Sequence, residues 1–366
     1  MIFMKIGEVI QLLERWAPPA LQENYDNSRL IVGSADRDCI GVLVCLDCTE
    51  DIVQEAIERG CNLVVSHHPI LFSPIKTLTG RTYPERTLIT AIEHKIALYA
   101  LHTNLDNVLS GVNKEMADRI GLSQLRILRP MANRLMKLVT YVPIGHLQSV
   151  REAIFEAGGG YIGNYDQCSF SVEGTGTFRP QEGTHPYSGK IGQLQEDTEH
   201  RLELVFPDYH QKAVLKALQE SHPYEEVAFE FYRLENTLPN VGAGMVGLLP
   251  EPMPTNEFLQ HIKSVFGGML RFTKPLKQNI VKVAICGGSG SFLTSDAIAA
   301  KADVFISSDF KYHQFFDAEQ HMMILDIGHF EAEQFTSNLI AAYLIEKIPN
   351  FAVLLTRHST NPVQYL

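Results

Sequence analysis

The sequence predicts an α/β protein with mostly parallel sheets and a smaller inserted domain. In the first and last thirds of the chain, short apolar runs alternate with helix-like segments, the order that gives parallel strands covered by helices. The middle third differs, because its βαββαβ order with alternating, glycine-rich strands is typical of a ferredoxin-like module. We therefore expect residues 1–125 and 236–366 to be two halves of one α/β domain, with residues 126–235 inserted between them.

The first half begins its sheet with CIGVLVCL (39–46), a continuous apolar run expected of a parallel strand covered on both faces. Thr49 can cap a helix over EDIVQEAIER, which Gly60 ends. The remaining segments alternate in the same way: strand NLVVS (62–66), helix ERTLITAIEHK (85–95), strand IALYAL (96–101) and helix GVNKEMADRI (111–120).

The last third repeats this alternation. Its predicted elements are strand IVKVAIC (280–286), a tight loop GGSGS (287–291), helix TSDAIAAK (294–301), strands VFIS (304–307) and MMILDI (322–327), one long amphipathic helix from about residue 330 to 347, and strand FAVLLT (351–356). The insert is predicted as strand 135–143, helix 149–158, strands 169–178 and 200–207, helix 211–222 and strand 227–235.

Composition favours a cytoplasmic enzyme or binding protein over a membrane or nucleic-acid-binding one. The chain is 45% hydrophobic and 20% charged, as in soluble globular proteins, and it has no apolar run of eighteen residues. Its N-terminus lacks the pattern of a signal peptide, and its six cysteines lie mostly in strand-like runs, as buried thiols of a reducing compartment would. The net charge of −11, with no Lys/Arg cluster, argues against a nucleic-acid partner.

Polar side chains follow the last residue of four predicted parallel strands. In open α/β sheets, ligands bind at the carboxyl ends of the strands, so we expect these side chains to share one location. The four clusters are His67 with His68, His102 with Asp106, Asp309 with His313, and His329 with Glu333.

This combination of imidazoles and carboxylates predicts a site for two divalent metal ions. His329 and Glu333 are four residues apart at the start of a helix and therefore lie on one face. Side chains of adjacent strand residues point to opposite faces, so His67 and His68 more easily reach two different ions than one. Imidazole with carboxylate suits zinc first, then iron or manganese, rather than calcium. Any one cluster alone would more often be ordinary loop residues, and only the conjunction of four favours the metal site.

Other motifs carry weaker signals. GAGMVG (242–247) matches GxGxxG but follows a loop rather than a strand, so no dinucleotide site is expected. CLDC (45–48) has no second cysteine pair, and we expect Cys45 to be a core residue. GGSGS could bind an anion through its backbone N–H groups or simply make a tight turn.

Three further residues are candidates for contacts around the site. Asp26 and Asn27 could touch the substrate or support the ligands, whereas Lys76 is expected to be an ordinary loop residue.

The stretches SHHP, HTNLDN, ENYDNSRLIVG, SSDFKYH and GHFEAE together resemble the Ngg-interacting-factor-three-like family, also described as GTP cyclohydrolase I type 2 homologues. The resemblance covers essentially the whole chain. It implies a pair of divalent metals between two similar α/β halves, with His67, His68, Asp106, His329 and Glu333 as ligands and Glu333 bridging. One departure is that members often have a second His after the equivalent of His329, where this chain has Phe330, which changes the polarity beside that ligand.

The resemblance also extends to the insert and the assembly. The insert resembles the PII/CutA trimeric signalling fold, and HPYEEVAFEFY (222–232) looks like its closing stretch. A hexameric ring is the assembly that the family implies.

We expect a dinuclear metal-dependent hydrolase in which a metal-activated water attacks the substrate and His102 or His313 moves protons. The resemblance implies hydrolytic opening of the purine ring of GTP, a nucleotide substrate, with release of formate. The alternative is a non-catalytic, metal-stabilised binding or regulatory scaffold whose PII-like insert senses a ligand, and closed metal coordination would mark it.

Overall fold

The structure is a computed structural model that describes residues 4–366. It divides into two compact units. One contains the chain up to Arg129 together with Asn240–Leu366, and the other is Pro130–Pro239. No helix within residues 4–366 is long and apolar enough to cross a membrane.

The first sheet of the larger unit has five strands in the order β17-β4-β5-β6-β2. They are β17 (Val353–Leu355), β4 (Val42–Cys45), β5 (Leu63–Ser66), β6 (Ala97–Ala100) and β2 (Leu30–Val32), of which only β2 pairs antiparallel to its neighbour. Every residue of β4, β5 and β6 is buried, which explains why these strands are continuous apolar runs.

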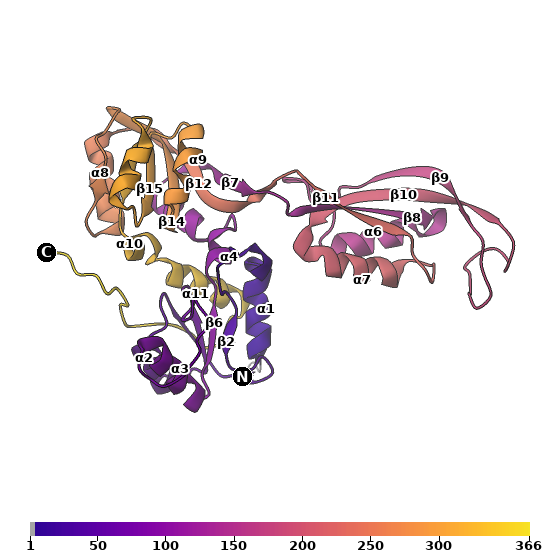
Figure 1. The fold of residues 1–366 in the computed structure, drawn as a ribbon, viewed down its shortest axis with the longest axis horizontal. Coiled ribbons are helices and arrows are strands. Elements are labelled where there is room, and N and C mark those ends of the chain that lie inside the picture. The colour runs from indigo at the N-terminus through magenta and orange to yellow at the C-terminus, as the bar shows by residue number, and fades with distance from the viewer. Residues whose placement is uncertain (1–3) are drawn as a thin grey trace. The chain divides into compact units, whose positions relative to one another are not determined.

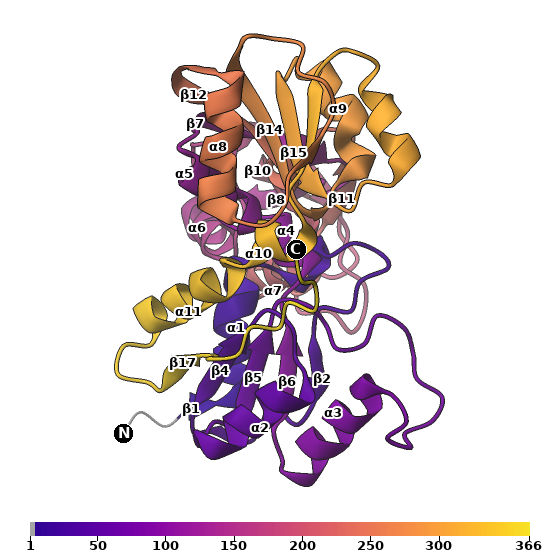
Figure 2. The same ribbon diagram turned by 90° about the vertical axis from the view of Figure 1, so that its left-hand side faces the viewer.

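Helices complete the core around this sheet. α2 (Glu50–Glu58) and α3 (Tyr83–Glu93) lie together (Figure 2), and their apolar side chains share one core cluster with Leu43, Val64 and Leu98 of the sheet. α1 (Ile6–Trp16) contacts α11 (Thr336–Lys347), and α11 also packs on β4 and β17. A short pair, β1 (Met4–Lys5) and β3 (Asp38–Cys39), lies beside α1.

The second sheet has six strands in the order β13-β16-β15-β14-β12-β7. They are β13 (Arg271–Phe272), β16 (Met323–Asp326), β15 (Val304–Ser308), β14 (Asn279–Ser289), β12 (Leu238–Pro254) and β7 (Ser123–Met131). β14, β15 and β16 are parallel, whereas β12 is antiparallel to β14 and β13 is antiparallel to β16.

Alternating side chains of the second sheet enter two separate cores. Ile306 of β15 packs with α5 (Val112–Ile120) and α8 (Thr255–Phe266), whereas Phe305 packs with α9 (Thr294–Ala299). α8 and α9 accordingly lie on opposite sides of this sheet (Figure 2).

Each half of the chain contributes a strand to the sheet of the other half, an arrangement that the sequence pattern does not predict. β17 was assigned to the second half but pairs parallel with β4 in the first sheet. β7, which straddles the predicted boundary at residue 125, belongs to the second sheet. The physical reason is that backbone groups at a sheet edge need partners, and the returning chain supplies them for β4.

The predicted single helix over residues 330–347 is wrong. It is two helices, α10 (His329–Glu333) and α11, separated at Gln334 and Phe335. α10 contacts β14 and β15 of the second sheet, while α11 packs on the first. One straight helix could not follow both surfaces. The Gln334 side chain stabilises the break by donating hydrogen bonds to the carbonyls of Phe266 and Glu331.

The smaller unit follows the predicted βαββαβ order (Figure 1). Its elements are β8 (Leu135–Pro143), α6 (Leu147–Glu156), β9 (Phe170–Phe178), β10 (Gln195–Pro207), α7 (Gln211–Ser221) and β11 (Phe229–Leu234). The sheet is antiparallel throughout in the order β11-β8-β10-β9, so the first and third strands are central. Both helices cover one face, where Val150 and Leu218 meet Leu138, Leu204 and Phe206.

Glu55 of α2 fastens the chain that follows β17. It is buried, and its carboxylate accepts hydrogen bonds from the Arg59 guanidinium, the Thr356 hydroxyl and the Arg357 backbone N–H. Burial raises the pKa of Glu55, but these donors outweigh burial and hold the pKa below the ordinary value of 4.5.

We expect Glu55→Gln to lower the free energy of unfolding by about 1–3 kcal/mol at pH 7, because a charged acceptor is replaced by a neutral one. Since the folded pKa is depressed, the charged form contributes fully above the ordinary glutamate pKa and its contribution is lost as pH falls through the folded value. Urea unfolding from pH 7 to pH 3 should show the difference between wild type and variant shrinking. The exposed Glu58→Gln on the same helix is the control, and a difference that stays constant with pH would contradict this account.

Candidate metal centre

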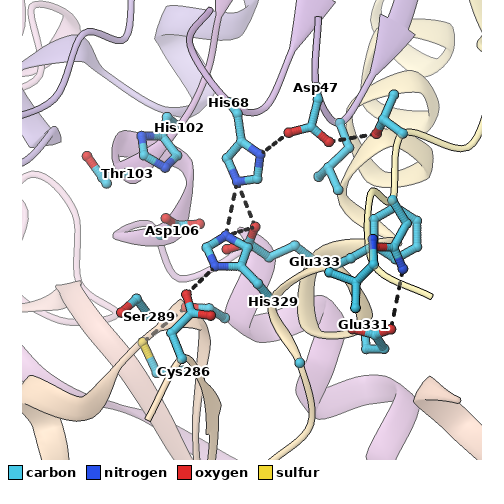
Figure 3. Close-up of a pocket in the computed structure, with 18 of the residues that line it drawn as sticks. Asp47, His68, His102, Thr103, Asp106, Cys286, Ser289, His329, Glu331 and Glu333 are labelled. Carbon is cyan, nitrogen blue, oxygen red and sulfur yellow. Dashed lines mark hydrogen bonds and ion pairs between the residues drawn. The ribbon is translucent and has the colours of Figure 1, made fainter. Parts of the chain in front are cut away.

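Strand ends from both sheets of the larger unit meet at one cluster of imidazoles and carboxylates (Figure 3). His67 and His68 directly follow β5, and Asp106 ends the short helix α4 (Thr103–Asp106) that follows β6. His329 and Glu333 are the first and last residues of α10, which follows β16. The structure therefore brings together all five side chains that the resemblance implies as ligands.

Glu333 lies at the centre of the cluster. Its Oε2 atom is 2.9 Å from His68 Nε2 and 3.1 Å from His329 Nε2. The two imidazole Nε2 atoms are themselves 3.3 Å apart. These three donor atoms form a group that could hold one metal ion.

A second group shares Glu333. His67 Nε2 is 3.7 Å from Asp106 Oδ1 and 3.8 Å from Glu333 Oε2. His67 Nε2 and Asp106 Oδ1 are both buried, and neither has a hydrogen-bond partner among residues 4–366. Buried polar atoms are nearly always paired, so two orphaned acceptors that face each other fit a site that takes a cation. His67, Asp106 and Glu333 could hold a metal ion.

In each of the three histidines, Nδ1, the ring nitrogen that faces away from the cluster, already has a hydrogen-bond partner. His67 Nδ1–H donates to the Leu101 carbonyl at 2.9 Å, and because a carbonyl only accepts, Nε2 keeps its lone pair. His68 Nδ1 donates to Asp47 at 2.7 Å and His329 Nδ1 donates to Asp309 at 2.6 Å. Metal-binding histidines almost always have such a partner on the ring nitrogen that faces away from the metal. The donor set therefore fits divalent metal ions.

Asp47 is a functional candidate that sequence reasoning missed. It lies inside CLDC, which was considered only as a cysteine pair. The available signal was its place two residues after β4, at the same sheet edge as the histidines. Its second carboxylate oxygen accepts a hydrogen bond from the Thr360 hydroxyl at 2.6 Å, so the C-terminal segment helps to orient His68.

The structure places the two predicted proton carriers differently. His102 lies at the edge of the cluster, with its ring centre 5.2 Å from that of His67 and 5.4 Å from that of His68. His313 is exposed on the 3-10 helix Tyr312–Ala318 and does not line the cavity. The reason is the left-handed backbone at Asp309 (φ 59°), which keeps Asp309 at the site while the chain beyond it turns outward.

The remaining candidates are supporting or distant residues. Asp26 is buried and accepts hydrogen bonds from Ser28, Thr103 and the His102 ring, so it positions His102. Asn27 donates to the Leu71 carbonyl, and Lys76 is exposed in its loop.

GGSGS is not the tight loop that was predicted. β14 continues through Ser289, with a register shift against β15 between Ile285 and Ser289. Gly287 N–H donates to Asn113, and the Gly288 carbonyl accepts from the hydroxyls of Ser307 and Ser308. Gly288 has φ 60°, and a Cβ atom there would lie 2.3 Å from Glu333 Oε1, so the glycine makes room for the central carboxylate. GAGMVG lies within β12, which excludes the strand–turn–helix context of a dinucleotide site.

The charges within the cluster compensate one another. Burial raises the pKa of Glu333, but the facing imidazoles of His329 and His68 hold it well below its usual range. Burial lowers the pKa of both histidines, yet the charge of Glu333 and their carboxylate partners raise the pKa of His68 to about 10 and that of His329 to about 11. Burial and the neighbouring Glu333 charge raise the pKa of Asp106 to about 7. These positions favour positive charge, whether it comes from protons or from a metal that displaces them.

The cluster opens into a cavity of about 910 Å³ within the larger unit. This volume lies within the range of small-molecule sites. Aromatic side chains and the C-terminal segment from Thr360 to Tyr365 form much of its wall.

We expect Asp47→Asn to weaken zinc binding by about 10- to 100-fold, because the carboxylate that orients His68 and increases its basicity is lost. Competition titrations against a chromogenic chelator measure this affinity. Asp51→Asn, an exposed residue on α2, is the matched control, and equal affinities for the two variants would refute the role of Asp47.

Comparisons with known proteins agree with this structure. The family model of Duf34/NIF3 (NGG1p interacting factor 3) matches residues 4–362. A GTP cyclohydrolase 1 type 2 homolog of Halalkalibacterium halodurans is 40% identical over 89% of both chains, and one of Bacillus subtilis is 35% identical over 98% of both. The solved structure of a Bacillus cereus protein related to NIF3 is 36% identical over 99% of both chains, with a TM-score of 0.88.

The family match spans nearly the entire chain, and the resemblance stated from SHHP, HTNLDN and GHFEAE is thereby confirmed. This chain belongs to the Duf34/NIF3 (NGG1p interacting factor 3) family.

Proposed function

We propose that this protein is a metal-dependent hydrolase that binds two divalent ions, with zinc preferred to iron or manganese. His67 and Asp106 would hold one ion and His68 and His329 the other, and Glu333 would contribute to both groups. The observation that supports this most directly is the pairing of two donor groups through Glu333, while the outward ring nitrogen of each histidine is already occupied.

When bound, paired divalent ions lower the pKa of water to near neutrality and polarise the bond that is cleaved. The chain supplies the rest. The Glu333 carboxylate lies among the three imidazoles of His67, His68 and His329 and offsets positive charge held there. His102 donates Nδ1–H to Asp26, which leaves Nε2 free to accept a proton, and the Asp26 carboxylate stabilises the resulting imidazolium.

The cavity favours catalysis over a purely structural metal role. A closed structural site has no space for a substrate, whereas this cluster borders about 910 Å³ of open volume. The relatives are named GTP cyclohydrolase 1 type 2 homologs, and by kinship we propose hydrolytic opening of a nitrogen-containing ring, of which a purine is one example.

We expect Glu333→Gln to lose most of the bound metal, because the shared carboxylate is a donor to both groups and its negative charge offsets the cations. Elemental analysis of protein purified without chelator measures the metal content. Glu346→Gln, on the exposed side of α11, is the control. A Glu333→Gln protein that keeps its full metal content would rule out a shared bridging role.

The two donor groups also predict that a substitution in one group removes one metal ion and leaves the other bound. His68→Ala should remove one ion and leave the group of His67, Asp106 and Glu333 able to hold the other, and Asp106→Ala should do the reverse. Metal stoichiometry of the two variants tests this. If each variant retains all metal, or if wild type binds only one ion per chain, the two-ion arrangement is wrong.

A further inference from the structure

We propose that the cavity takes an uncharged or cationic nitrogen heterocycle or cyclic amide, and that it discriminates against phosphorylated nucleotides. This inference rests on the proposed hydrolase function and specifies its substrate class.

The first argument is the charge of the cavity wall. Seven carboxylate side chains line it, against one guanidinium and no lysine. A bound pair of divalent ions and the guanidinium together would not balance seven carboxylates at neutral pH. A triphosphate would add further negative charge to a wall that already has an excess, and like charges in a partly desolvated site repel strongly.

The single guanidinium is partly engaged by the protein. Arg271 pairs with the buried carboxylate of Asp326 and donates to the Phe310 carbonyl. Phosphate recognition relies on an Arg fork or a Lys that has donors available for the oxygens. Both contacts use Nη2 of Arg271, which belongs to each two-donor edge of the guanidinium, so Nε and Nη1 remain only as single donors for a phosphate while Arg271 pairs with Asp326.

The second argument concerns the glycine-rich segment at the cavity. Backbone N–H groups of such a segment can cradle phosphate where they point outward from a turn. Here Gly287 N–H is taken by Asn113, and the Gly288 carbonyl is held by two serine hydroxyls. Residues 287–289 are therefore part of β14, and the left-handed Gly288 makes room for the Glu333 carboxylate, which would repel an anion at this segment.

The third argument is the composition of the rest of the wall. Phe72, Phe292 and Tyr25 line the cavity with more than half of each residue exposed, and Met269 and Tyr365 add further apolar surface. Such side chains stack on or pack against flat rings.

Glu331 supplies a polar contact that suits the N–H groups of such a ring. It is 5% exposed, lines the cavity, and accepts a hydrogen bond from the neutral Asn361 amide at 3.5 Å. A buried carboxylate that is an acceptor only suits a ring N–H, an amide N–H or a cationic nitrogen. Phosphate oxygens offer it no donor.

The reaction on such a ring balances without a co-reactant. The oxygen of water adds to the ring carbon, the C–N bond breaks, and the proton taken from water passes by way of His102 to the leaving nitrogen. The products are a carboxylate or formyl group and an amine on one opened chain.

Probes that share one ring and differ in an anionic substituent test the proposal on the zinc-loaded full chain. Dihydrouracil is compared with its carboxylated analogue dihydroorotate, and guanosine with GMP and GTP. Binding is measured by titration calorimetry and ring opening by NMR. We expect the uncharged member of at least one pair to bind about tenfold tighter than its charged partner. Charged partners that bind equally or better, or no binding by any uncharged probe, would overturn the proposal.

Glu331→Gln provides a second readout with little change of shape. Removing this negative charge should improve binding of the anionic probes relative to the uncharged ones by severalfold, whereas the exposed Glu346→Gln should leave the ratio unchanged. An unchanged ratio in Glu331→Gln would count against the role of wall charge.

The outcomes separate this proposal from the proposed function. Hydrolysis of GTP in preference to guanosine would refute the substrate class and leave the hydrolase intact. Tight binding of uncharged rings with no ring opening by zinc-, iron- or manganese-loaded protein would instead refute the hydrolase.

Discussion

The rest of the larger unit depends on the contacts between the buried Glu333 carboxylate and the imidazoles around it. Glu333 is 2% exposed, and it faces imidazoles from the first sheet on one side and from the second sheet on the other. A buried carboxylate is costly unless it is paired, and removing one partner leaves an uncompensated charge. The two sheets must therefore present their strand ends to each other in one arrangement, because only this arrangement surrounds Glu333 with positive charge.

The strand exchange between the sheets explains how the chain holds that arrangement. β17 lies beside β4, so the chain that has just passed through α10 at the cluster returns to the first sheet. Glu55 then accepts hydrogen bonds from Thr356 and Arg357. The Thr360 hydroxyl donates a hydrogen bond to Asp47, the partner of His68. One continuous segment thus connects the second sheet, the first sheet and the wall of the cavity.

The insertion point follows from the same topology. β7 and β12 are neighbours at one side of the second sheet, so the chain leaves the larger unit and re-enters it on adjacent strands. A complete ferredoxin-like unit with its own apolar core can be accommodated there without breaking any strand pairing around the cluster. The site and its cavity are formed by residues of the larger unit alone.

The class of fold, the βαββαβ order of the insert and the candidate donors could be predicted from the sequence, because apolar runs and the polar residues that end them are local patterns. SHHP, HTNLDN and GHFEAE each place a donor after a strand, and parallel strands present these ends at one edge. Which residues support those donors, and which lie elsewhere, depends instead on contacts between distant parts of the chain. Asp47 is within hydrogen-bonding distance of His68 because β4 and β5 are paired, and His313 is turned outward by the backbone at Asp309. The grouping of the other four side chains around the Glu333 carboxylate likewise depends on contacts between residues that are far apart in the chain. His68 and Glu333, for example, are more than two hundred positions apart, and spacing along the chain carries no information about such contacts.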